Sequence, residues 1–138
     1  MSKSRKGSGV NAKGRSKGGG RFVKLDYAML DGPAGRSLKP GEWAVLIRAM
    51  QLYHGENNGR IALSSRDAAD LAKVSKDTAA RHILTLCEKG FMRIKTPSSF
   101  GRNGCKATEY YLTMFPTRKG HPAPRDFQRW QPPAKNKS

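Results

Sequence analysis

A chain of 138 residues with a formal net charge of +17 has room for one small domain with tails. Its longest apolar run, WAVLI at residues 43–47, is far shorter than the roughly 20 residues that cross a bilayer, and no apolar run follows the basic N-terminus. We therefore expect neither a membrane span nor a signal peptide, and a cytoplasmic, nucleoid-associated protein.

The positive charge is concentrated at the two ends of the chain. Residues 1–24 hold eight Lys or Arg and no acid, and residues 116–138 hold six bases and one acid. The intervening residues 25–115 have a net charge of only +4. Bases at chain ends do not stabilise a core, so this excess indicates an anionic partner or a role in solubility.

Residues 1–20 consist mainly of Gly, Ser, Lys and Arg, a composition that favours disorder. We interpret this segment as a basic arm that contacts DNA phosphates or enters a minor groove, with a solvated tail as the alternative. The bases expected to make these contacts are Arg5, Lys6, Lys13, Arg15, Lys17 and Arg21.

The expected folded domain, residues 21–116, begins with a short strand or extended edge. A helical turn is expected to begin among Tyr27, Met29 and Leu30, followed by a loop at residues 31–37. Pro40 fits the first turn of a helix, where its missing amide costs nothing. A cluster of turn-forming residues at 55–60, GENNGR, then leads into a short strand at residues 60–63. The expected buried face of the helix consists of Trp43, Leu46, Ile47 and Met50.

The next stretch predicts two helices joined by a tight turn at Lys73 and Val74. Ser65 and Ser75 are the expected caps of the two helices, because their hydroxyls can accept from amides of the first turn. Gly90 is typical of a left-handed helix terminator. The apolar face of the second helix consists of Ala79, Ile83, Leu86 and Cys87, which recur at spacings of three and four.

This pair is typical of a helix-turn-helix whose second helix, residues 75–89, lies in the major groove of DNA. The alternative is an ordinary helical hairpin with a hydrated polar face. Arg81 is the expected base reader, since a bidentate pair with guanine is worth about 1–3 kcal/mol, and Asp77 is expected to orient it. The candidate DNA contacts of this helix are Ser75, Lys76, Asp77, Thr78, Arg81 and Thr85.

After the second helix the pattern changes to the period of a strand. Residues 91–96 and 107–114 are expected strands on either side of a turn-rich basic loop at residues 97–106. Such a hairpin forms a wing, so the chain predicts an α+β winged helix-turn-helix: three helices and a small antiparallel β-sheet, with disordered basic termini. The expected wing contacts to the DNA backbone or minor groove are Arg102, Asn103 and Lys106, with Ser98 and Ser99 as lesser ones.

Residues 117–138 are rich in Pro, Arg and Lys and are expected to be mostly extended or disordered. Phe127 and Trp130 are the exception in this tail. They form either a short motif that docks on a protein partner or folds back on the domain, or a pair of aromatics that rests loosely on the surface.

Catalytic and metal-binding groups do not converge in this sequence. The three histidines have no carboxylate or cysteine at ligand spacing, and Cys87 and Cys105 fit free thiols rather than a disulfide. We therefore expect no enzyme activity, no metal and no cofactor.

From Phe22 to Pro116, about two-thirds of the chain, the layout resembles a group of small bacterial winged-helix proteins. More distantly it resembles the N-terminal origin-binding domain of phage replication protein O, in which a Tyr-x-Gly element, here Tyr53-His54-Gly55, precedes a similar hairpin and wing. The stretches that carry the likeness are NNGRIALS, SKDTAARHILTL, EKGF and ATEYYLT. The resemblance implies a winged-helix fold, and such folds serve repressors, initiators and adaptor proteins alike.

The leading hypothesis is sequence-specific binding to double-stranded DNA by a transcriptional regulator. One alternative is an initiator or accessory protein of phage or plasmid replication, and another is an RNA-binding protein, which the charged, Gly-rich ends suggest. The regulator could act as a homodimer, although no dedicated dimerisation helix is evident in the sequence. A further alternative is a winged helix that binds proteins only, against which the net charge of +17 argues.

Overall fold

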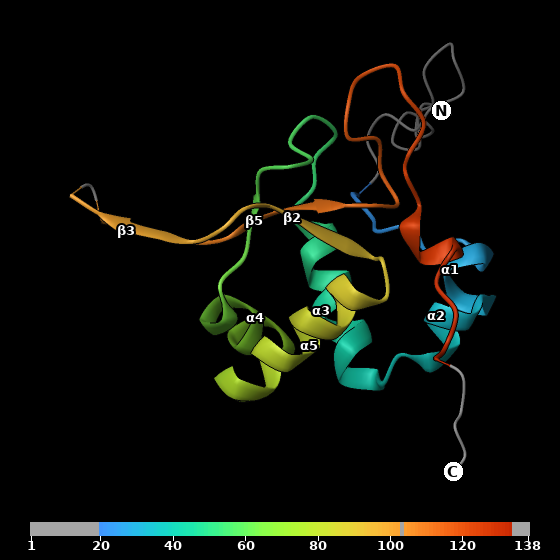
Figure 1. Ribbon diagram of the computed structural model, residues 1–138, viewed down its shortest axis with the longest axis horizontal. Coiled ribbons are helices and arrows are strands. Elements are labelled where there is room, and N and C mark those ends of the chain that lie inside the picture. Colours follow the sequence, from blue (N-terminus) through green and yellow to red (C-terminus); the bar gives the residue numbers. More distant parts are fainter. Residues whose placement is uncertain (1–19, 103, 134–138) are drawn as a thin grey trace, which may run out of the picture.

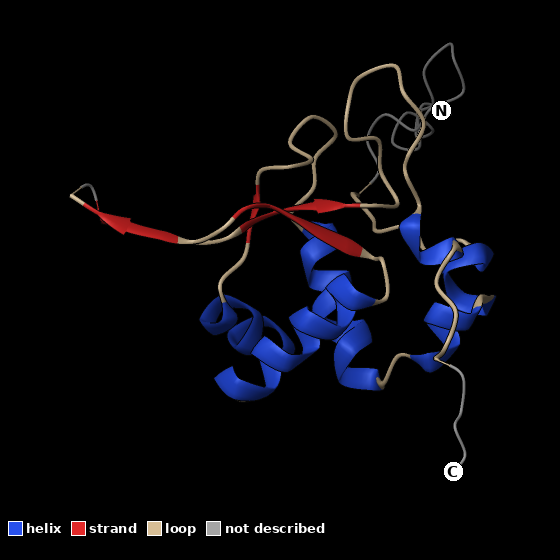
Figure 2. Cartoon of the chain, in the orientation of Figure 1, coloured by secondary structure: helices blue, strands red, loops and turns tan. Residues whose placement is uncertain are grey.

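Three helices pack against one another on one side of a small antiparallel sheet, as Figure 1 and Figure 2 show. This computed structural model describes residues 20–102 and 104–133. Most of the expected N-terminal arm, from Arg5 to Lys17, therefore lies outside the described residues, as does Asn103 in the wing. The three main helices are α3 (Pro40–Gln51), α4 (Ser65–Ala72) and α5 (Lys76–Glu88).

The boundaries of these helices follow from capping chemistry. Pro40 is the first residue of α3, and the amide of Lys39 donates to Glu42 Oε1 at 2.9 Å. The cap of α4 is Ser64, whose hydroxyl accepts from the Asp67 amide at 3.0 Å. The expectation of Ser65 as cap is wrong by one position. Ser64 and Ser65 each offer a hydroxyl oxygen, and the helix begins after Ser64.

The turn between α4 and α5 is as tight as the sequence predicts. Lys73 adopts the left-handed conformation, with φ +61°, and ends α4. Ser75 then caps α5 by accepting from the Thr78 amide at 3.1 Å. Gly90 follows α5 with φ +89°, which confirms it as a left-handed residue after the helix.

The sheet has the strand order β1–β5–β2, and both pairs are antiparallel. A further hairpin, β3 paired with β4, continues outward from β2 and β5 as the wing. The expected loop at residues 97–106 is therefore largely a two-stranded ribbon, because residues 99–101 pair with residues 104–106. The strands are β1 (Ile61–Ala62), β2 (Met92–Thr96), β3 (Ser99–Gly101), β4 (Gly104–Lys106) and β5 (Glu109–Leu112).

The residues before α3 confirm the expected helical turn at Tyr27 to Leu30, but residues 33–37 are helical where a loop was expected. They form two short helices, α1 (Tyr27–Asp31) and α2 (Pro33–Ser37). The Asp26 carboxylate caps α1 by accepting from the Met29 amide at 3.0 Å, and Pro33 begins α2. A β-carbon on Gly35 would lie 1.8 Å from the Met29 carbonyl oxygen, so the close packing of α2 on α1 requires glycine.

The turn at residues 55–60 has a structural role. The side chain of Asn58 accepts from the Leu112 amide at 2.7 Å and donates to the Leu112 carbonyl at 3.0 Å. These bonds fasten the turn to the end of β5 and fix the entry into β1.

The hydrophobic core lies between the three main helices and the sheet. The expected apolar face of α5 is confirmed for Ala79, Ile83 and Leu86, which are buried, whereas Cys87 is only partly buried. In α3 the expected Leu46 and Met50 are buried, while Trp43 and Ile47 pack at the margin. The central residues of the core are Leu46, Leu86, Phe91, Met92 and Leu112.

The C-terminal segment corrects the expectation of a mostly disordered tail. Residues 126–128 form a 3-10 helix, and Phe127, only 2% exposed, stacks on Phe91 with ring centroids 5.0 Å apart. The amide of Arg125 donates to the Thr113 carbonyl at 2.7 Å. Burial of a large aromatic side chain offsets the entropy of ordering this segment, so Phe127 belongs to the core and is not exposed for docking on a partner.

The order of elements and the pairing of strands give a winged helix-turn-helix fold. The helix-turn-helix is α4 and α5, α3 supports both, and the sheet extends into the wing. Within the described part of the chain, no helix is long and apolar enough to cross a membrane.

Candidate nucleic-acid interface

The start of α5 presents a polar surface. Ser75, Lys76, Asp77 and Arg81 are exposed, whereas Thr78 is partly buried. Thr85, two turns along the helix, is also partly buried. Of the six expected contacts on this helix, the four exposed ones lie on the face that a duplex could approach.

Arg81 is turned outward and is held near the start of the helix. Its Nη2 donates to Thr78 Oγ1 at 3.3 Å, and the Ser75 hydroxyl donates to the same oxygen at 2.9 Å. The expected partner Asp77 forms no ion pair with Arg81 among the described residues. Thr78, and not Asp77, therefore orients Arg81. Thr78 lies three positions before Arg81 and Asp77 four, and both spacings bring side chains together on a helix.

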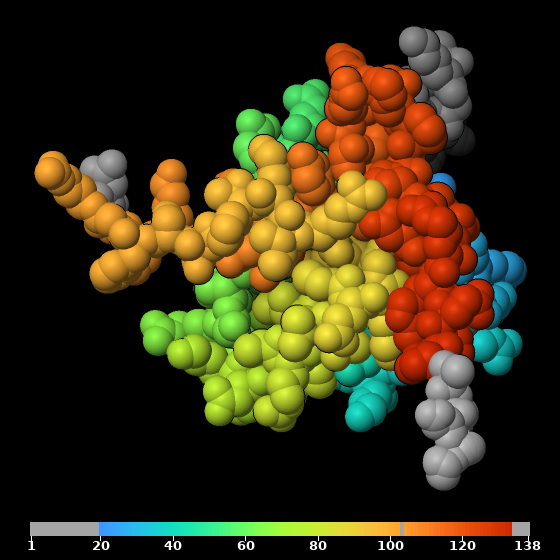
Figure 3. Space-filling model, in the orientation of Figure 1, coloured from blue at the N-terminus to red at the C-terminus, as the bar shows by residue number. Residues whose placement is uncertain are grey.

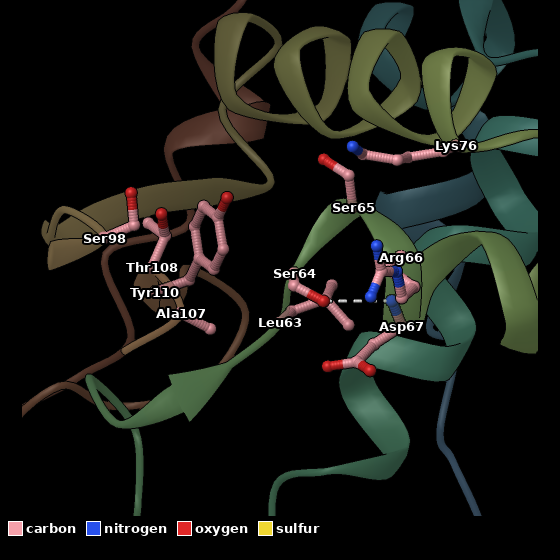
Figure 4. A pocket seen from close by; sticks show the side chains of 10 residues that line it. All are labelled: Leu63, Ser64, Ser65, Arg66, Asp67, Lys76, Ser98, Ala107, Thr108 and Tyr110. Atoms are coloured by element: carbon pink, nitrogen blue, oxygen red, sulfur yellow. Dashed lines mark hydrogen bonds between the residues drawn. The ribbon is translucent and has the colours of Figure 1, made fainter. Parts of the chain in front are cut away.

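A hollow of about 510 Å³ lies between the helix-turn-helix and the base of the wing (Figure 4). The starts of α4 and α5 form one side, through Ser65, Arg66 and Lys76, and Ser98 and Thr108 lie on the other. The hollow brings together two cations, one carboxylate and five hydroxyl groups. Its residues are Leu63, Ser64, Ser65, Arg66, Asp67, Lys76, Ser98, Ala107, Thr108 and Tyr110.

The chemistry of this hollow suits an anion with several oxygen atoms. Amides at the starts of α4 and α5 carry the positive ends of the helix dipoles, and Arg66 and Lys76 add full positive charges. Burial raises the pKa of the Tyr110 hydroxyl, and nearby Cys87 raises this pKa further. A hydrogen bond with Thr108 lowers it by less than the other two raise it. The phenol therefore stays neutral at physiological pH and adds no negative charge to the hollow.

The wing is cationic along its length. Residues 92–106 contain four Lys or Arg and no acid. Arg93 is paired with Asp126, its Nε lying 2.7 Å from Oδ2, whereas Lys95, Arg102 and Lys106 form no ion pair among the described residues. Arg102 and Lys106 are both exposed, as the sequence predicts for contacts to phosphate.

Several residues of this surface were missed at the level of sequence. Ser65 was expected only as a helix cap and Arg66 had no expected role, and only the fold brings them beside Lys76. Leu84 is 58% exposed on α5, and Ala80 is exposed one turn before it. Their position on the outer face, between Asp77 and Glu88, could have identified them as candidate DNA contacts. Apolar side chains in such a position can contact thymine methyl groups.

The remaining expected contacts lie elsewhere. Arg21 is exposed near the start of the described chain. Nothing in the described geometry brings Arg21 to the hollow.

Metal binding and nucleophilic attack by a thiol are two other kinds of chemistry that protein side chains can support. Within residues 20–102 and 104–133, no three His, Cys, Asp or Glu side chains are grouped closely enough to hold a metal ion. Burial raises the pKa of the Cys87 thiol to about 11, with Glu88 contributing, so this thiol stays protonated and is a poor nucleophile near neutral pH.

Comparisons with protein-family models, with curated proteins and with solved structures found no match to this chain. The likeness to small bacterial winged-helix proteins and to phage replication protein O therefore stays a prediction from the sequence, whereas the winged helix-turn-helix fold rests on the arrangement of helices and strands.

Proposed function

We propose that this protein binds double-stranded DNA in a sequence-specific manner and acts as a transcriptional regulator. In this proposal α5 enters the major groove, and the wing lies along the backbone or minor groove next to it. The proposal rests on one observation: Lys76 at the start of α5 and Ser98 at the base of the wing line the same hollow. The two parts that should contact DNA thus open on one surface.

The expected contacts divide into two kinds. Arg81 and Lys76 project from the first turns of α5 toward base edges, with Leu84 available to a thymine methyl group. Arg66, Arg102 and Lys106 neutralise phosphates on either side and supply affinity that does not depend on sequence. The division predicts that different substitutions affect specificity and affinity separately.

Selection from a library of random-sequence duplexes tests the proposal. Wild-type protein should enrich one motif, and binding to that motif should exceed binding to a scrambled duplex by roughly 10³-fold or more. Arg81→Ala should reduce this preference by roughly 5- to 150-fold, which corresponds to about 1–3 kcal/mol, while binding to the scrambled duplex changes little.

Arg36→Ala is the matched control, because Arg36 is an exposed arginine on α2, on the far side of the molecule from α4 (Figure 1). It removes the same charge and should leave the enriched motif and its preference unchanged. Failure to enrich any motif, or tighter binding to structured RNA than to every duplex, would contradict the proposal.

Mapping of bound sites across the genome of the source cell separates regulation from replication. Sites scattered among promoters support the regulator. Repeated sites clustered at one origin would instead assign the protein to replication.

A further inference from the structure

The wing carries an aromatic side chain that nothing in the described structure covers. Phe100, on β3, is 83% exposed. The β3–β4 ribbon stands away from the body of the protein, as Figure 1 and Figure 3 show. Leaving a Phe side chain in water forgoes about 1.5–3 kcal/mol of burial, and a polar or β-branched residue would sustain the ribbon equally well. The fold does not require Phe100.

The two faces of the ribbon differ in chemistry. Phe100 lies directly opposite Cys105, so both side chains project from one face, while Ser99 lies opposite Lys106 on the other face. Arg102 occupies the turn that joins the strands. The ribbon therefore has an apolar face, a cationic turn, and an opposite face that is polar and carries Lys106.

We propose that Phe100 inserts as a wedge between neighbouring base pairs from the minor groove, so that the protein bends the DNA that it binds. The inference rests on the proposed function, because it requires the wing to lie on a duplex. It adds an activity, deformation of DNA, and assigns it to one residue outside α5.

Charge decides the occupant in favour of DNA. The cations of the ribbon, Arg102 in the turn and Lys106 on the other face, form no ion pair among the described residues, and residues 92–106 contain no acid. An aromatic side chain among unpaired cations is disfavoured as a contact between two copies of this chain, since the cations of each copy would repel those of the other. Next to DNA the same cations neutralise phosphates as the ring leaves water.

The dimensions of the ribbon indicate deformation rather than simple contact. Two paired strands lie about 4.8 Å apart before the thickness of their backbones is added, whereas the minor groove of B-form DNA is only about 6 Å wide. The ribbon tip therefore enters only if the groove widens. A wedge of this kind unstacks one step and kinks the duplex by roughly 20–90° toward the major groove, which opens the minor groove.

The test measures binding and bending on the same duplex. A duplex that contains the selected motif carries a donor and an acceptor dye at its two ends, so anisotropy reports binding and energy transfer reports bending. Wild-type protein should raise the energy transfer. Phe100→Ala should remove most of that rise when the duplex is saturated, and Phe100→Leu should keep much of it, because leucine is also an apolar wedge.

Phe22→Ala is the matched control, since Phe22 is 82% exposed and belongs to the segment before α1 rather than to the wing. It should bend DNA as wild type does. Replacement of adenines by 2-aminopurine, one position at a time, should show increased fluorescence at a step flanking the motif with wild-type protein and with Phe22→Ala, but not with Phe100→Ala.

The outcomes distinguish this inference from the proposed function. If the wild type binds no duplex, the proposed function fails and the wedge with it. If the wild type binds the motif but Phe100→Ala bends it equally, the wedge alone is wrong. The wedge is also overturned if Phe100→Ala weakens binding to single strands and duplexes alike without changing the bend, or if light scattering shows that wild-type protein self-associates through Phe100 without DNA.

Discussion

Phe127 and Phe91 stack with their ring planes within 8° of parallel, although 36 residues separate them in the sequence. Phe91 directly follows Gly90, the left-handed glycine after α5, and both rings are buried. The C-terminal segment therefore supports the junction from which the wing begins.

Phe127→Ala should lower the free energy of unfolding by about 3–5 kcal/mol, because it removes a large buried ring and leaves a cavity. Urea denaturation followed by tryptophan fluorescence measures this change. Phe22→Ala, which removes an exposed ring, should change the free energy by no more than about 0.5 kcal/mol. Equal values for the two variants would show that Phe127 does not complete the core.

Gly90→Ala should be much more destabilising than Gly55→Ala. Both glycines have positive φ, +89° and +105°, so an alanine is strained at either position by about 1 kcal/mol. At Gly90 a β-carbon would also lie 2.7 Å from the Asp126 carbonyl carbon, whereas at Gly55 it would meet nothing within 4 Å. The difference between the two free energies of unfolding isolates the contact with the C-terminal segment, and a difference near zero would contradict that contact.

Asp126→Asn should destabilise the protein more at pH 7 than at pH 2. The bidentate bond from Arg93 lowers the pKa of the Asp126 carboxyl, aided by Arg129 and opposed by burial. Because the folded-state pKa lies below the unfolded value near 3.8, the carboxylate stabilises the fold at higher pH and loses this contribution as the pH falls through the folded-state pKa.

The loss at pH 7 should be about 0.5–1 kcal/mol, since Arg93 is partly exposed and water screens the pair. Denaturation curves at the two pH values measure it. Asp31→Asn is the control, because Asp31 forms no ion pair among the described residues, and it should change stability little at pH 7. A loss for Asp126→Asn that is the same at both pH values would contradict the ion pair.

Arg66→Ala should reduce the slope of log K against log[salt] for duplex binding by about 1 in magnitude, and Lys76→Ala should do the same if Lys76 contacts phosphate. The reason is that each neutralised phosphate releases a counterion. Arg36→Ala removes the same charge away from the hollow and should leave the slope nearly unchanged. Titrations at several salt concentrations measure the slopes, and equal slopes for Arg66→Ala and Arg36→Ala would remove the hollow from the interface.

Local signals were sufficient to predict the helix-turn-helix. Ser75, Gly90 and the apolar residues of α5 act through bonds and contacts within a few positions, so their roles were visible in the sequence. The expected cap at Ser65 was wrong by one residue because Ser64 offers the same chemistry. The short helix α2 was missed because its five residues carry little periodicity, and its requirement for Gly35 arises only from packing on α1.

Contacts between distant segments were harder to predict. The composition of residues 117–138 favours disorder, yet the buried ring of Phe127 and the bonds of Arg125 and Asp126 hold this segment against the domain. Arg66 could not be assigned to the same surface as Lys76 and Ser98, because only the angle between the helices and the wing brings the three together. Arg81 was predicted on the exposed face, but its partner Thr78 depends on the rotamer of a long side chain.

The position of Phe127 in the core has a consequence for the synthesis of the protein. The helices and the sheet are complete by residue 112, but the cavity beside Phe91 stays open until residue 127 has left the ribosome. Until then the ring of Phe91 is left uncovered in the nascent chain, and such transiently exposed apolar surface is prone to aggregation. Completion of the core is thereby coupled to translation of the segment that contains Phe127.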